Sequence, residues 1–246
     1  MDKMIYVAMT GARQTLRAQS SVSHNIANAA TPGFRAVQQS VDPATVTGPG
    51  LGSRINVVGR PDVWNPQPGA MMQTGRDLDI AVQGQGWLAV QDPNGNEAYT
   101  RAGDLRVNPT GLLETGTGHL VLGSGGPVSL PPFDTLYVGG DGRISIVPSG
   151  QSPDSLVEAD QIKLVNPDTA ELTRSGDGLF RLKDGAAAQA DPSVRIANGQ
   201  LEASNVNPAE ALVQMIELSR RFEMQVRSMH TAEQNDEATA RLMRMS

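Results

Sequence analysis

The side chains that most often do chemistry in proteins are few in this sequence and lie far apart. Its three histidines, His24, His119 and His230, fall in different regions, and none belongs to a His-Glu-x-x-His or similar metal-ligand spacing. The chain has no cysteine, which excludes disulfides, thiolate metal sites and a cysteine nucleophile. Each histidine is therefore predicted to be an ordinary surface or interface residue.

One loop resembles a calcium-binding motif. Asp92, Asn94 and Asn96 alternate as the first ligands of a calcium loop do. Glu97, however, stands where such a loop needs glycine, and Gly103 stands where it needs a bidentate glutamate. The segment is therefore predicted to be a hairpin turn.

No other pattern completes an active site. The glycine-rich stretches GQGW and GSGG are not part of a strand–GxGxxG–helix unit, and no Gly-x-Ser-x-Gly elbow occurs. Asp77 and Asp79 would face the same side of a strand, but Arg76 and Arg101 offer them charge partners. We therefore expect no enzyme activity, no catalytic residue, and no cofactor or metal site.

Composition favours a turn-rich β protein. The 246 residues are 39% hydrophobic and only 4% aromatic, with 26 glycines and 16 prolines. The net charge of −6, without a large basic cluster, argues against a nucleic-acid partner. The N-terminus lacks the apolar stretch of a cleaved signal peptide, and no run of eighteen apolar residues exists, so we expect no insertion into a membrane.

The elements that would position any functional residues fall into three zones. Residues 1 to about 28 have the heptad spacing of a helix that packs along another helix. Residues 35 to about 205 contain short apolar runs separated by turn signals, too closely spaced for βαβ units, which predicts an antiparallel β module. Within it, residues 35–76 are predicted to be an extended linker or insertion.

The third zone is a second helix. Asn207 as N-cap, Pro208 in the first turn and Glu210 two residues later form a helix start signal. Both helices then carry residues at alternating four- and three-residue steps. These heptad residues are Ile5, Met9, Ala12, Leu16, Gln19, Ser23 and Ile26 in the first helix, and Leu212, Met215, Ser219, Phe222, Val226 and Met229 in the second.

The first helix is predicted to end in a tight turn. Pro32 disfavours a helical Thr31, and Pro32-Gly33 suits the centre of a type II turn, in which Gly33 has a positive φ. Asn28 is a candidate C-cap in the left-handed region, and Phe34 would anchor the chain after the turn. We expect Asn to be tolerated at position 33 better than a β-branched residue, since Asn enters the left-handed region at low cost.

Three ordered motifs resemble the flagellar axial proteins, the rod and hook proteins of bacterial flagella. NIANAATPGF resembles their Asn-x-x-Asn-x-x-Thr-x-Gly-Phe signature, carried here by Asn25, Asn28, Thr31, Gly33 and Phe34. TGRDLDIAVQGQGWLAVQ and the YTRAGDLRVNPTGLLET that follows resemble their β core, and the C-terminal segment resembles their last helix. Length and detail are most similar to the proximal-rod members.

The resemblance implies a structural subunit whose terminal helices pair as a coiled coil. An inner helical domain would take residues 1–34 and 205–246, residues 35–76 would be the linker, and residues 77–204 would form the outer wall. Its partners would be other rod proteins, distal and proximal, copies of itself and, during secretion, the flagellar export apparatus. Such proteins are exported unfolded, without signal cleavage, into the periplasmic space.

The resemblance also implies an assembly interface on the heptad residues Ile5, Met9, Leu16, Ile26, Leu212, Met215, Phe222, Val226 and Met229. Helices whose apolar stripe has no cover within the chain are expected to order only on assembly. The alternative is a trimeric fibre or phage-tail-like binding protein with helical stalks, which would be a stable trimer in solution. A stalk needs only one helix, whereas this chain has matching helices at both ends.

Overall fold

The computed structural model describes residues 4–45, 55–59, 63–152 and 155–244. The chain forms two compact units. The first, here called the helix unit, comprises Met1–Ala29, Ala36–Asn65 and Val206–Ser246, and the second, the β unit, comprises Ala30–Arg35 and Pro66–Asn205. The structure is mainly β, with a helix near each end of the chain, as predicted.

The helix unit is built on two long helices, α1 (Met4–Ala27) and α2 (Pro208–Arg244). The predicted start of α2 is confirmed. Asn207 Oδ1 accepts hydrogen bonds from the backbone N–H groups of Ala209 and Glu210, at 3.1 and 3.4 Å, and so satisfies donors that have no partner within the helix. Neither helix, over the residues described, has the long apolar stretch that a membrane crossing requires.

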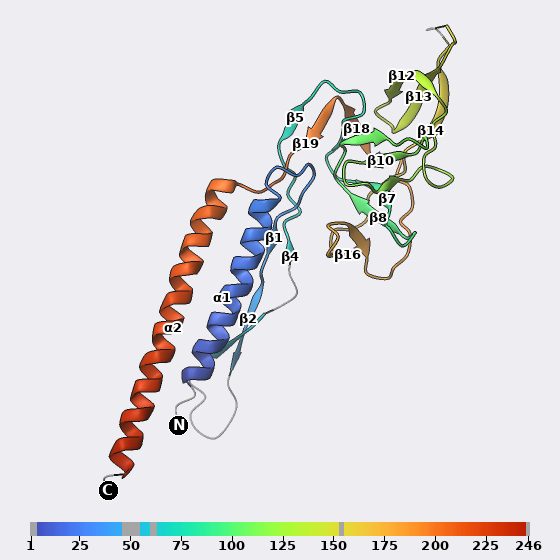
Figure 1. The fold of residues 1–246 in the computed structure, drawn as a ribbon. Coiled ribbons are helices and arrows are strands. Elements are labelled where there is room, and N and C mark those ends of the chain that lie inside the picture. The colour runs from blue at the N-terminus through green and yellow to red at the C-terminus, as the bar shows by residue number, and fades with distance from the viewer. Residues whose placement is uncertain (1–3, 46–54, 60–62, 153–154, 245–246) are drawn as a thin grey trace. The chain divides into compact units, whose positions relative to one another are not determined.

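The two helices run antiparallel and lie side by side (Figure 1). Gln19 near the end of α1 donates a hydrogen bond of 3.4 Å to the hydroxyl of Ser219 near the start of α2. Gly11 lies so close to Gln225 that an added Cβ would be 3.0 Å from its amide nitrogen. The buried apolar side chains of the pair are small ones, at Ala8, Ala12, Val22, Ala211 and Ala232, whereas the larger Ile26, Met215, Phe222 and Met229 are only partly buried. The contact is therefore close but leaves the larger apolar side chains partly exposed.

Residues 36–65 belong to the helix unit, whereas the sequence predicts a linker there. Four strands pair antiparallel, β1 (Val37–Gln38) with β4 (Val63–Trp64) and β2 (Val41–Thr45) with β3 (Ile55–Gly59). The side chain of Gln39 donates to that of Gln14 in α1 at 2.8 Å. The strands thus pack along α1, which supplies the second surface that an isolated hairpin needs. Parts of this predicted linker, at 46–54 and 60–62, lie outside the described residues.

The β unit contains the remaining strands, and all their pairings are antiparallel, as predicted. The largest sheet has the order β16-β17-β8-β7-β11-β10-β9, with β15 also paired to β7, and three further groups are β12-β13-β14, β18-β6 and β19-β5. The strand bounds are β5 Met71–Gln73, β6 Ile80–Gln83, β7 Trp87–Gln91, β8 Glu97–Thr100, β9 Leu105–Val107, β10 Leu113–Thr115, β11 Leu120–Val121, β12 Phe133–Val138, β13 Arg143–Pro148, β14 Val157–Gln161, β15 Leu164–Val165, β16 Leu172–Arg174, β17 Phe180–Leu182, β18 Arg195–Asn198 and β19 Gln200–Glu202.

The predicted hairpin at the calcium-like segment is confirmed. Asp92 Oδ1 accepts hydrogen bonds from the backbone N–H groups of Asn94 and Asn96, at 2.8 and 2.9 Å, so its carboxylate closes the turn between β7 and β8. Its other oxygen accepts from Arg181 at 2.8 Å. The hydrogen bond from Arg181, helped by those of the turn, lowers the pKa of Asp92 to about 2.

The core of the β unit is formed by side chains from the largest sheet, from the pair β6 and β18, and from the group β12-β13-β14. Its fully buried members include Ile80, Leu88, Leu105, Ile144 and Ile162. Segments from the C-terminal end of this unit, β18 and β19, pair with its first strands, β6 and β5. Residues close to position 200 are therefore needed to complete a unit that begins near residue 66.

Candidate assembly surface

The turn after α1 adopts the predicted geometry. The backbone N–H of Phe34 donates to the carbonyl of Thr31 at 3.3 Å, and Gly33 has a φ of +66°. Gly33 N–H donates to the carbonyl of Glu202 at 2.7 Å. A Cβ at position 33 would lie 2.2 Å from the carbonyl carbon of Arg101. The turn therefore needs glycine for space as well as for its φ.

The two asparagines of the motif hold the chain by their side chains. Asn25 is buried, and its amide accepts from the N–H of Val37 and donates to its carbonyl, both at 2.8 Å. Asn28 does not have the left-handed conformation predicted for it, since no described residue other than glycine has a positive φ. Instead its side chain donates to the carbonyl of His24 at 2.9 Å, which satisfies a carbonyl at the end of the helix.

Phe34 is buried within the β unit, as expected of an anchor. Only 8% of it is exposed, and the guanidinium carbon of Arg174, in β16, lies 5.1 Å from the centre of its ring. A cation over an aromatic face at this distance is attracted by the negative charge of the ring face.

Next to this anchor lies a buried ion cluster that the sequence reasoning missed. Glu202, with no exposed surface, pairs with Arg35 through one oxygen and with Arg101 through the other, the latter at 3.1 Å. The first oxygen also accepts from the N–H of Gly69 at 2.9 Å. Burial lowers the pKa of Arg101; Glu202 opposes this shift and Arg35 adds to it. One buried carboxylate is thus shared by two buried arginines, each of which pairs with one of its oxygens.

This cluster corrects one expected charge pair. Arg76 does lie beside Asp79, with Nε 3.3 Å from the carboxylate. Arg101, which was expected to be a charge partner of Asp77 or Asp79, instead pairs with Glu202. Its guanidinium is held there by two further hydrogen bonds, to the carbonyls of Val82 and Gly84 at 3.2 and 2.7 Å. Glu202 is 101 residues away along the chain. No local sequence pattern indicates that pair.

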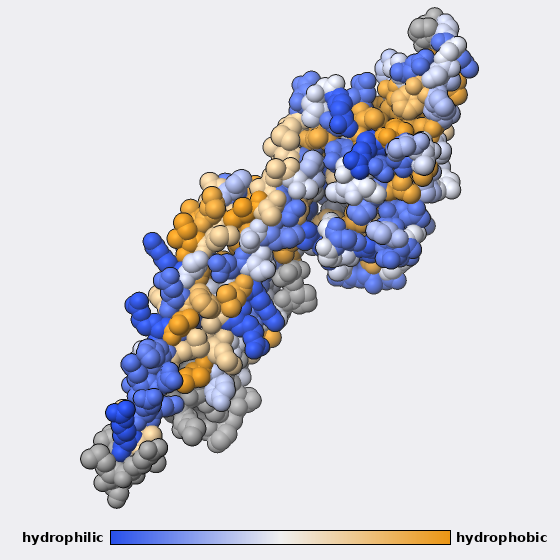
Figure 2. Space-filling model, viewed as in Figure 1, coloured by the Kyte–Doolittle hydropathy of each residue, from blue (hydrophilic) through white to orange (hydrophobic). Residues whose placement is uncertain are grey.

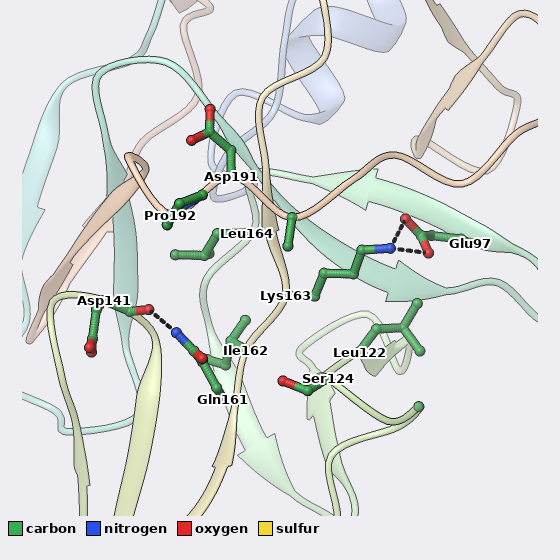
Figure 3. A pocket seen from close by; sticks show the side chains of 13 residues that line it. Glu97, Leu122, Ser124, Asp141, Gln161, Ile162, Lys163, Leu164, Asp191 and Pro192 are labelled. Atoms are coloured by element: carbon green, nitrogen blue, oxygen red, sulfur yellow. Dashed lines mark hydrogen bonds and ion pairs between the residues drawn. The ribbon is translucent and has the colours of Figure 1, made fainter.

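The β unit also contains a cleft of about 500 Å³ (Figure 3). Lys163 Nζ donates to both carboxylate oxygens of Glu97, at 2.9 and 2.8 Å, and the side-chain amide of Gln161 donates to the carbonyl of Asp141 at 3.0 Å. These polar groups are engaged with one another. Across the described parts of the chain, no three His, Asp or Glu side chains gather where they could hold a metal ion.

The predicted heptad residues divide into two sets in the helix unit. Ile26, Met215, Phe222 and Met229 are partly buried, on the side of each helix that faces the other. Met9, Leu16, Leu212 and Val226 are exposed by between 43 and 52%. Among the buried apolar positions of α1, Ala12 is itself a predicted heptad residue, whereas Ala8 and Val22 each precede one. Part of the predicted heptad thus lies in the helix–helix contact and part lies along its open edge.

An open groove of about 490 Å³ runs along this edge. It is lined by Ile5 of α1 and by Val226, Met229, His230 and Glu233 of α2. With 100° between successive residues of a helix, Met9 and Leu16 lie on the same side of α1 as Ile5. Figure 2 shows hydrophobic residues over α2 and beside α1 on the visible face of this unit. We call this surface the groove face.

Removing Glu202 should destabilise the β unit strongly. Glu202→Ala leaves Arg35 and Arg101 buried without a counter-charge, and the expected loss is about 3–5 kcal/mol of unfolding free energy. Urea unfolding followed by Trp87 fluorescence, in a Trp64→Phe background, measures it. The control is Glu114→Ala, whose partner Arg106 is exposed and whose loss should be about 1 kcal/mol or less. Equal losses for the two variants would contradict a structural role for the cluster.

Substitution of Gly33 should be poorly tolerated whatever the new side chain. Because the space is filled by the backbone of Arg101, Gly33→Asn should cost clearly more than the ~1–2 kcal/mol of a left-handed conformation, which revises the expectation of a mild effect. Gly75→Asn is the matched control, since Gly75 has a φ of +71° and open space around it. Thermal unfolding compares them, and similar melting temperatures would show that space does not matter at position 33.

Comparison with known proteins finds flagellar rod and hook proteins for the N-terminal, central and C-terminal parts of the chain. Three family models match: flagella basal body rod protein at residues 5–35, the flagellar hook protein FlgE/F/G D1 domain at 81–150, and the flagellar basal body rod FlgEFG protein C-terminal region at 197–242. The first match contains the turn motif, and the last contains Glu202 and most of α2.

The relatives are rod proteins. The chain is 42% identical to the flagellar basal-body rod protein FlgF of Salmonella typhimurium and 40% identical to that of Escherichia coli, in both cases over 100% of each chain. It is 29% identical to FlgG of Buchnera aphidicola, over 95% of this chain and 97% of the relative. The chain therefore belongs to the family of flagellar basal-body rod proteins and resembles its FlgF members over its full length.

Proposed function

We propose that this chain is a subunit of the proximal rod of the flagellar basal body and polymerises there through its helix unit. The observation that carries the proposal is the groove face, where Met9, Leu16 and Val226 are exposed on a pair of helices that buries mainly alanines. Exposed apolar side chains at helical spacing are the usual sign of a missing partner helix. The role is structural, and we propose no catalysed reaction.

The proposal includes the chain's partners and its route. Neighbouring subunits would be copies of this chain and other rod proteins, joined by heterologous contacts that extend into a helical tube instead of closing a ring. The tube would act as drive shaft and export conduit in the periplasmic space. The chain would reach it through the flagellar export apparatus, unfolded and without signal cleavage. Membership of the rod family favours this function over the trimeric fibre.

The β unit would form the outer wall of the rod. Its own core is independent of the heptad residues, since its buried members come from strands between β6 and β18. The Asn25 side chain and the buried cluster at Glu202 would fix where the chain leaves the last turn of α1 and where it returns toward α2. In this proposal the turn motif depends on β19, because Gly33 and Arg35 both bond to Glu202.

A charge on the groove face should block assembly without unfolding the protein. Leu16→Glu changes an exposed residue, so the unfolding free energy of the isolated chain should change by about 0.5 kcal/mol or less. In the native bacterium the variant should be stable yet leave cells without motility, because the carboxylate would be buried against a neighbouring helix. Swimming assays and electron microscopy of basal bodies measure this.

Arg17→Glu is the matched control. Arg17 is exposed on α1, one residue further along and turned by 100°, away from the groove. Cells with this substitution should swim. Normal swimming of the Leu16→Glu cells would show that the groove face does not contact another subunit and would remove the observation on which the proposal stands.

A further inference from the structure

Helix α2 has a second apolar surface, on the side opposite to α1. Val213, Ile216 and Met224 are each more than half exposed. With 100° between residues, they lie within about 80° of one another and opposite to the buried Ala211 and Ala232. We call this surface, with Arg220 and Arg227 between and after these residues, the α2 ridge. A helix that is apolar on two opposite sides needs a partner on each of them.

We propose that the α2 ridge of one copy docks into the groove face of a second copy of this chain. The proposal rests on the proposed function and names the contact through which the copies would join. Ridge and groove are different surfaces of the same molecule, so the contact is heterologous and repeats from copy to copy. One chain thus carries both halves of an interface that does not close.

The spacing of the two surfaces agrees. Ile216 and Met224 are eight residues apart along α2, or about 12 Å, and the exposed groove residues Met9 and Leu16 are seven apart along α1, or about 10 Å. The pairing of Gln19 with Ser219 sets the level of each groove residue along α2. Leu16 is then level with position 222 and Met9 with position 229, so a shift of about six residues, or ~9 Å, between parallel copies would place Ile216 beside Leu16 and Met224 beside Met9.

The same shift pairs opposite charges. Met224 would then lie within one residue of the level of Met9 and Met229, and Arg227 would lie level with Glu233 at the rim of the groove. Glu233 is exposed and its present neighbour is His230, at 3.4 Å. A rim ion pair of this kind adds little affinity by itself but fixes register. The charges therefore favour the parallel arrangement with a six-residue shift over a ridge-to-ridge contact.

Cysteine cross-linking tests the contact, because the chain has no cysteine of its own. Cells would produce two versions of the full-length protein with different tags, one carrying Met224→Cys and the other Met9→Cys, and isolated basal bodies would be oxidised. The expected product is a disulfide-linked dimer that carries both tags. A dimer of two Met224→Cys copies, or no dimer in basal bodies that contain both versions, would overturn the proposal.

Charge exchange provides a second readout. Arg227→Glu should reduce swimming, and adding Glu233→Arg in the same chain should restore it, because every copy supplies both sides of the pair. Arg221→Glu is the matched control: Arg221 follows the ridge residue Arg220 but lies 100° away from it, beside Glu217. Unchanged swimming with Arg227→Glu, or no restoration, would overturn the ridge contact. The proposed function would still stand if Leu16→Glu abolishes assembly.

Discussion

Two helices that meet through alanines cannot cover the larger apolar side chains that they also carry. In this protein α1 and α2 approach closely because Gly11 and four alanines line their contact. The larger apolar side chains between the helices are only partly buried, and Tyr6, Met9 and Leu16 lie outside the contact. Burial of such side chains is what stabilises helices in proteins, at about 1.5–3 kcal/mol each. The apolar side chains that lie outside therefore contribute little of this free energy to the isolated chain.

The β unit follows the opposite rule. It has a large apolar core, its strands pair antiparallel, and its buried arginines find their carboxylate partner within the unit. Glu202 accepts from Arg35, Arg101 and Gly69, which come from three distant parts of the chain. Such a cluster adds little net stability, but it penalises every arrangement in which one member is missing. A unit with a complete apolar core and a unit with large apolar side chains on its surface are thus combined in one chain.

Local chemistry explains what could be predicted from the sequence. The Asn207 cap, the positive φ of Gly33 and the Asp92 turn depend on neighbours within four residues, and each is confirmed. The heptad spacing of both helices could be recognised in the sequence. Because each helix carries apolar residues on several sides, however, the sequence does not show which side packs against the other helix. Contacts over long separations were missed altogether: the sequence shows neither the Glu202 cluster nor the strands of 36–65 along α1. A left-handed backbone conformation was predicted for Asn28 from the general preference of asparagine. In the structure Asn28 lacks this conformation, and its side chain donates a hydrogen bond to the carbonyl of His24.

Hydrogen exchange compares the two elements most directly. In the isolated full-length protein, backbone amides of α1 and α2 should exchange much faster than those of β7 and β13, since little apolar burial opposes local opening of the helices. In purified basal bodies the same helical amides should become as slow as those of the β unit, whose rates should hardly change. Helical amides that are already as protected in the isolated protein as the β core would contradict the account, because the helices would then need no partner.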